Sequence, residues 1–126
     1  MNIDALSLED FLVLRASAQR FQEKYECDLR QCSESMRAKN IEKIINLDMA
    51  ISRCNRRENS FTPAECKLLI AAVEYYRGIL PQSSQNAHLI ITILLEKLAA
   101  YIFKIRSDNM PIVYSNNIND SILTNS

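Results

Sequence analysis

The chain of 126 residues contains one glycine, Gly78, and three prolines, Pro63, Pro81 and Pro111. Neither residue type occurs before position 63. Antiparallel β-hairpins usually turn at glycine or at Asn-Gly pairs, so the first half of the chain is a poor candidate for β-structure. The scarcity of both residues argues against a sheet-rich domain and predicts long helices joined by few turns.

The chain also lacks an excess of charge of either sign, because 15 lysine and arginine residues balance 15 aspartate and glutamate residues. Without a net positive field, long-range attraction to nucleic acid or to anionic lipid is weak. Arg53, Arg56 and Arg57 form one local basic cluster. Cations favour the negative C-terminal end of a helix, so we interpret this cluster as a helix end rather than a phosphate-binding site.

Residues that could carry catalysis or bind a metal are sparse. His88 is the only histidine, and no motif places a nucleophile or an orienting carboxylate beside it. A glycine-rich phosphate loop is also lacking. The four cysteines do not form the two close pairs of a zinc site. Cys32, Cys54 and Cys66 fall on apolar stripes, where small buried thiols are common, and Cys27 does not. We therefore predict no enzymatic activity, no cofactor and no metal.

Export and membrane signals are lacking as well. The segment from Met1 to Ser7 has neither the basic nor the apolar region of a signal peptide, so we expect a cytoplasmic protein with reduced cysteines. Glu96 and Lys97 interrupt the most apolar segment of the chain. The uninterrupted apolar run is far shorter than the ~20 residues that a membrane span requires.

What the chain does contain is helical periodicity. Ser7 and Asp10 suggest a capping box at the start of a first helix. Steps of three and four predict that this helix runs for about 25–30 residues along one apolar stripe, which consists of Phe11, Leu14, Ala18, Phe21, Tyr25, Leu29, Cys32 and Met36.

A second apolar stripe begins at Ile41 and is rotated relative to the first; it consists of Ile41, Ile44, Leu47, Ile51 and Cys54. The change of phase predicts a break between Met36 and Ile41, with Asn40 as the N-cap of a second helix. A single bent helix is the alternative.

The start of a third helix has the clearest signal, because Thr62, Pro63 and Glu65 combine an N-cap hydroxyl, a proline at the first position and a capping-box carboxylate. This helix is predicted to end near Gly78. A fourth helix, from about Ser84–Asn86 to Arg106, is apolar almost all round, which is typical of a central helix packed on several sides.

These elements predict an all-α fold, an antiparallel helical bundle of about four helices with a long first helix, over residues 1–106. The composition changes at position 107. Asparagine and serine dominate residues 107–126, which we predict to be a flexible C-terminal tail.

The third and fourth helices are apolar over more than the single stripe that a bundle needs. On the third helix, Tyr76 is predicted to face the core and Tyr75 a second apolar face. Interface hot spots are enriched in tyrosine and arginine. We therefore predict a protein interface made of Tyr75, Arg77, Ile79, Leu89, Ile93 and Phe103. The alternative is that both apolar faces fill the core.

The sequence thus predicts a non-enzymatic protein–protein interaction module, an adaptor or inhibitor that binds and regulates a specific partner such as an enzyme. The spare apolar face could equally bind a second copy and form a homodimer. No nucleic acid, membrane span or small-molecule substrate is expected. The alternatives are a small dimeric secretion or assembly chaperone, a helix-turn-helix DNA-binding regulator, and an enzyme of an unrecognised type.

Overall fold

The computed structural model describes residues 6–109, 120–121 and 123–124. Four helices dominate it: α1 (Leu8–Asp28), α2 (Glu34–Asn55), α3 (Pro63–Ile79) and α4 (Gln85–Asn109). Two short strands, β1 (Asp120–Ser121) and β2 (Leu123–Thr124), pair antiparallel, with Asp120 opposite Thr124 and Ser121 opposite Leu123. The predicted all-α bundle with a long first helix is confirmed, although α1 has 21 residues and is shorter than the length expected from its apolar stripe.

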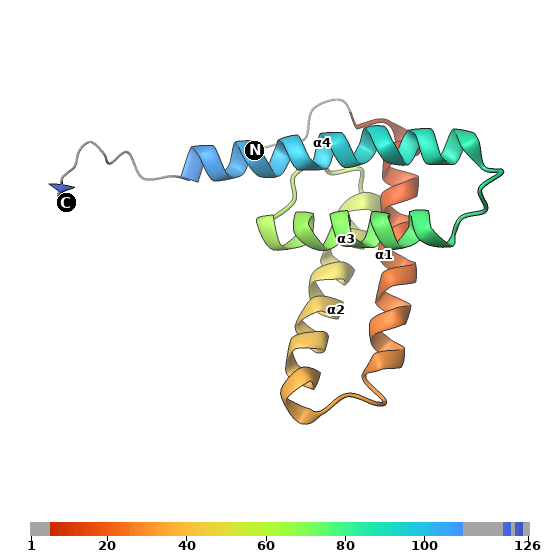
Figure 1. Ribbon diagram of the computed structural model, residues 1–126, viewed down its shortest axis with the longest axis horizontal. Coiled ribbons are helices and arrows are strands. Elements are labelled where there is room, and N and C mark those ends of the chain that lie inside the picture. The colour runs from red at the N-terminus through yellow and green to blue at the C-terminus, as the bar shows by residue number, and fades with distance from the viewer. Residues whose placement is uncertain (1–5, 110–119, 122, 125–126) are drawn as a thin grey trace.

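The four helices form two antiparallel hairpins that cross each other steeply. In Figure 1, α3 and α4 lie side by side, and the α1–α2 hairpin descends from them. The helix α3 contacts all three other helices, whereas α4 contacts α3 and only slightly α1. The expectation that the fourth helix is central was therefore wrong: α3 occupies the centre and α4 lies at the edge.

Capping boxes fix the starts of α1 and α3, as the sequence predicted. The Ser7 hydroxyl accepts from the backbone N of Asp10 at 3.1 Å, and the Asp10 carboxylate accepts from the backbone N of Ser7 at 3.0 Å. At α3 the corresponding distances between Thr62 and Glu65 are 3.1 and 3.0 Å. Each box satisfies two backbone N–H groups that the helix itself leaves without a partner.

The chain does break between α1 and α2, but earlier than predicted. The helix α1 ends at Asp28, and Ser33 in an extended conformation is the N-cap of α2. Asn40, the predicted N-cap, lies buried inside α2. The turn itself is closed by local bonds, among them Cys32 N to Asp28 O at 3.0 Å. Apolar spacing continues through this turn, so periodicity alone did not reveal it.

The core lies where the hairpins cross, and α3 supplies two packing flanks to it. The largest buried side chains come from every helix and include Leu14, Leu47, Leu69, Val73, Ile91, Leu94 and Leu98. Tyr75 and Tyr76 are both half-buried against this core. The surplus apolar surface of α3 is therefore used inside the molecule, because one flank meets α4 and the other meets the α1–α2 hairpin.

The helix α4 continues to Asn109, three residues past the predicted boundary at 106. The predicted flexible tail otherwise falls mainly on residues 110–119, 122 and 125–126, which lie outside the described part of the chain. Among the described helices, none combines the length and the apolarity that a membrane crossing requires.

Candidate protein-binding surface

The helix α4 carries apolar residues on the side that faces away from α3. We call this the α4 outer face and define it as Leu89, Ile93, Glu96, Ala100 and Phe103, all of which are exposed. The exposed fractions of its large apolar side chains are 60% for Leu89, 44% for Ile93 and 72% for Phe103. Three of the six predicted interface residues thus lie on one surface.

The opposite side of α4 explains why the helix has a fixed orientation. Ile91, Leu94, Leu98 and Tyr101 are spaced by three or four residues and are all buried. The Cys66 thiol on α3 also lies 3.8 Å from the backbone oxygen of Leu98. Because this inner face is fully packed, the residues of the outer face cannot turn inward without unpacking the core.

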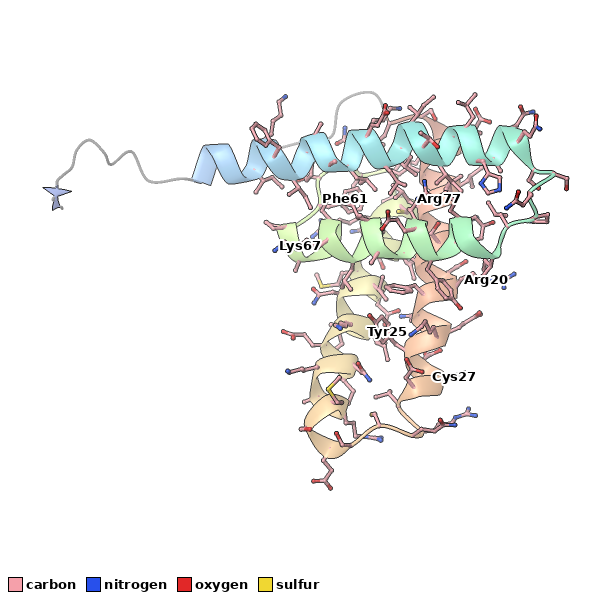
Figure 2. All side chains as sticks on the ribbon, viewed as in Figure 1. Arg20, Tyr25, Cys27, Phe61, Lys67 and Arg77 are labelled. Carbon is pink, nitrogen blue, oxygen red and sulfur yellow. The ribbon has the colours of Figure 1, made fainter. Side chains whose placement is uncertain are left out.

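The other three predicted residues do not belong to this surface. The ring of Tyr75 packs against Phe21 of α1, with 5.5 Å between the ring centroids, and Tyr75 is half-buried against the core. Arg77 lies 3.7 Å from Glu74 in a pair on α3; Figure 2 labels it on that helix. Ile79 is exposed, but it follows Tyr75 by one turn and so lies on the flank of α3 that meets α1.

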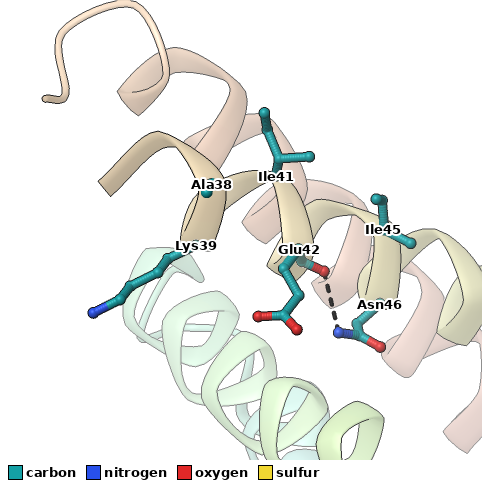
Figure 3. Close-up of a pocket in the computed structure, with 6 residues that line it drawn as sticks. All are labelled: Ala38, Lys39, Ile41, Glu42, Ile45 and Asn46. Carbon is teal, nitrogen blue, oxygen red and sulfur yellow. Dashed lines mark hydrogen bonds between the residues drawn. The ribbon is translucent and has the colours of Figure 1, made fainter. Parts of the chain in front are cut away.

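The outer side of α2 is a second apolar surface, which the sequence analysis missed. A hollow of about 640 Å³ runs along it, lined by Ala38, Lys39, Ile41, Glu42, Ile45 and Asn46 (Figure 3). Ile41, the first residue of the predicted apolar stripe of this helix, is 39% exposed. All six lining residues belong to α2, so the hollow is an open surface of one helix and not a cleft between elements.

Two of the three arginines in the basic cluster pair with glutamates. Arg53 lies 2.9 Å from the buried carboxylate of Glu65, and Arg56 lies 2.7 Å from Glu58. The hydrogen bond from Arg56 holds the pKa of the Glu58 carboxyl below its usual value. This pairing supports the helix-end interpretation, because Arg53 lies in the last turn of α2 and Arg56 is its C-cap.

The remaining reactive side chains are His88 and the cysteines. His88 Nε2 lies 3.1 Å from the backbone oxygen of Pro81, where it ties the start of α4 to the preceding loop. Cys54 and Cys66 are buried, and burial raises the pKa of both thiols to about 12. Within the described residues, no three His, Cys, Asp or Glu side chains gather into a group that could hold a metal ion.

Comparison with protein-family models, with curated proteins and with solved structures gives no match to this chain. The role of the α4 outer face must therefore be argued from its own chemistry.

Proposed function

We propose that this chain is a non-enzymatic interaction module that binds and regulates a partner protein through the α4 outer face. The observation that carries the proposal is the exposure of Leu89, Ile93 and Phe103 along one side of a single helix. Large apolar surfaces that stay exposed on a folded protein mark interaction sites. Burying one such side chain completely is worth about 1.5–3 kcal/mol.

The polar residues around this surface suit a binding role. Thr92 and Lys104 are exposed beside the apolar row. Interfaces commonly combine an apolar centre with a polar rim, since the centre supplies most of the affinity and the rim sets orientation. A helix that presents such a row is the usual ligand of an apolar groove.

The rigidity of α4 adds to this argument. Polar contacts add to the core packing that holds the helix against the rest of the molecule: Tyr101 bonds the backbone of Phe61, and Lys97 lies 2.8 Å from Asp10 at the start of α1. A surface that is ordered before binding loses little conformational entropy on binding. The α4 outer face therefore needs no folding step to accept a partner.

Site-specific photo-crosslinking in the source cells tests the proposal. A photoreactive amino acid at position 93 should form covalent adducts with a partner protein, because Ile93 would lie inside the interface. Position 12 is the matched control, since Leu12 of α1 is 47% exposed against 44% for Ile93. Adducts that form equally well from both positions would contradict the proposal.

The partner recovered in this way should then be titrated with the purified chain. We expect Ile93→Lys to weaken binding at least about 30-fold, the effect of losing an interface hot spot, and to abolish any change in the partner's activity. The control Leu12→Lys should leave both unchanged. Equal binding by the two variants would rule out the α4 outer face as the site.

A further inference from the structure

The end of the α1–α2 hairpin that lies beyond the crossing contains almost no buried side chains. We call residues 22–46 the hairpin arm; it consists of the last turns of α1, the connecting turn and the N-terminal part of α2. Within the arm, Asn40 is the one buried residue. Immediately outside it, Phe21 of α1 and Leu47 of α2 are both buried. The core therefore stops at the border of the arm.

The other two helices give the arm little support. In Figure 1 the arm extends away from α3 and α4, which lie across the other end of the hairpin. Tyr25 is the one apolar side chain of residues 22–46 that packs against the core, where its ring meets Phe21 with 4.9 Å between the ring centroids. Leu29 and Ile44 are half-buried. The two sides of the arm therefore pack mainly against each other.

Polar contacts near the surface also join the two sides of the arm. At its border, the half-buried Gln22 side chain donates to the backbone oxygen of Ile44 at 3.3 Å. At its tip, the exposed Arg37 guanidinium donates to the backbone oxygen of Leu29 at 3.2 Å. Hydrogen bonds of this kind stabilise a fold only slightly, because water competes for the same donors and acceptors.

Asn40 occupies the position at which an aliphatic side chain would stabilise the arm most. It is 5% exposed, and it lies on the same side of α2 as the buried Leu47, seven residues later. An aliphatic side chain gains hydrophobic free energy on burial, whereas an amide does not. Closing the arm also orders its residues, which costs conformational entropy. With a polar residue at its centre, the arm has little buried apolar surface to offset that cost.

We infer that the hairpin arm, weakened by Asn40, opens as one cooperative unit while the crossing of the two hairpins stays folded. Segments with few buried apolar contacts open at a lower free energy than the core. Opening separates the two sides of the arm and uncovers Ile44 beside the exposed Ile41 and Ile45. The arm is thus a conformational device that widens the apolar surface of α2 when it opens. The inference is independent of the proposed function, because the α4 outer face belongs to the other hairpin.

Hydrogen exchange of the full chain, followed residue by residue by NMR, tests the inference. After correction for intrinsic rates, the backbone amides of residues 38–46 should exchange at least about 100-fold faster than the slowest amides of α3, with one shared opening constant. Low concentrations of urea should speed this exchange less than that of α3, because opening the arm exposes less surface than complete unfolding. Equal protection of the arm and of α3 would overturn the inference.

A core substitution separates opening of the arm from unfolding of the whole chain. Ile91 of α4 is fully buried, and Ile91→Val should speed the exchange of the slowest α3 amides by about 3- to 10-fold. The exchange of the arm amides should stay unchanged, because the lost contacts are present whether the arm is closed or open. Acceleration of both sets by the same factor would mean that the arm opens only when the whole chain unfolds, which would overturn the inference.

Substitution of Asn40 tests the cause of the weakness. Asn40→Leu should slow the exchange of the arm amides at least about 10-fold, because a buried aliphatic side chain replaces a buried amide. The matched control is Asn46→Leu, at a half-buried asparagine of the same helix, which should change the exchange less than about 3-fold. If Asn40→Leu slowed the exchange no more than the control does, the inference would be contradicted.

Limited digestion of the full chain with trypsin gives an independent measurement. Lys39 and Lys67 are both exposed, and both lie within the first two turns of a helix, α2 and α3 respectively. A protease cleaves a helical peptide bond only after local unfolding, so cleavage after Lys39 should precede cleavage after Lys67. The reverse order would count against a separately opening arm.

Discussion

The phenolic hydroxyl of Tyr101 bonds both polar backbone groups of Phe61. It donates to the Phe61 carbonyl oxygen at 2.8 Å and accepts from the Phe61 backbone N at 3.2 Å. All of these atoms are buried, and Figure 2 labels Phe61 between the ribbons of α3 and α4. One side chain of α4 thus satisfies a loop residue that would otherwise have two unpaired polar groups.

Tyr101→Phe should therefore lower the free energy of unfolding by about 2–3 kcal/mol, because it leaves a buried N–H and a buried C=O without partners. Urea denaturation followed by circular dichroism measures the change. The control is Tyr76→Phe, at a half-buried tyrosine of α3, for which we expect less than about 0.5 kcal/mol. Equal effects of the two variants would contradict the role assigned to Tyr101.

Lys97 pairs with the buried carboxylate of Asp10, a residue that lies 87 positions earlier in the sequence. Lys97→Met should cost about 2 kcal/mol in unfolding free energy. This loss of unfolding free energy is smaller than the loss expected on breaking a fully buried ion pair. The reason is that the Lys97 side chain is 27% exposed and that Asp10 keeps its hydrogen bond from the backbone N of Ser7. Arg77→Met, which removes the exposed pair with Glu74, should cost less than about 1 kcal/mol. Thermal melts of the two variants give the comparison.

Arg57 has a φ of 55°, in the left-handed region, just after the end of α2. Its backbone N bonds the oxygen of Cys54 at 3.1 Å, and the N of Glu58 bonds the oxygen of Arg53 at 2.9 Å, which is the Schellman pattern. Glycine adopts this conformation without the cost of a Cβ atom. Arg57→Gly should therefore raise the unfolding free energy by about 1 kcal/mol. Urea denaturation of the variant and the unmodified chain measures this change, and a lower unfolding free energy for the variant would contradict the prediction.

The four thiols should differ in their reactivity with iodoacetamide. Cys27 is exposed and Cys32 is half-buried, whereas Cys54 and Cys66 are buried and keep a pKa of about 12. Only the thiolate reacts at a useful rate, so Cys27 should be modified first and the two buried thiols only on unfolding. Peptide mass spectrometry over time shows the order. Early modification of Cys66 in native protein would contradict the packing described above.

The same two thiols make stability depend on alkaline pH. Above pH 9.0 the thiols of the unfolded chain lose protons, while those of the folded chain keep them until about pH 12. The free energy of unfolding should therefore fall as pH rises from about 9 to about 12, by up to about 1.4 kcal/mol per thiol per pH unit. Urea titrations at pH 8 and pH 10 test this. In a Cys54→Ala, Cys66→Ala double variant, the free energy of unfolding should fall less between these two pH values than in the unmodified chain. An equal fall in both proteins would mean that other groups cause the pH dependence.

Local signals in the sequence were sufficient to predict a helix end wherever that end is fixed by residues within one turn of it. Ser7 with Asp10, and Thr62 with Glu65, predicted the starts of α1 and α3, because each capping box is closed within four residues. The position of the α1–α2 turn was predicted wrongly, because Leu29 and Cys32 continue the apolar spacing into the turn. The nearest sequence signal was Ser33 before Glu34, a polar pair that opens the acidic first turn of α2.

The candidate surface could be predicted only in part. The apolar excess of the third and fourth helices was visible in the sequence, and Leu89, Ile93 and Phe103 do lie exposed together. The contact of Tyr75 with Phe21 could not be predicted, because a helical wheel gives the direction of a side chain but not the neighbour that it meets. The hollow on α2 was missed for the same reason, since Ile41 and Ile44 differ in burial although both fit one stripe.

The amino-acid sequence by itself determined that this protein is helical. It also determined where α1 and α3 begin, because capping boxes and helical periodicity act over one or two turns. The tertiary structure decided which apolar faces are covered. It placed α3 between α4 and the α1–α2 hairpin, so that α3 buries both of its flanks and α4 buries one. Burial is a property of the neighbours that the crossing of two hairpins brings together, and no short stretch of sequence contains that information.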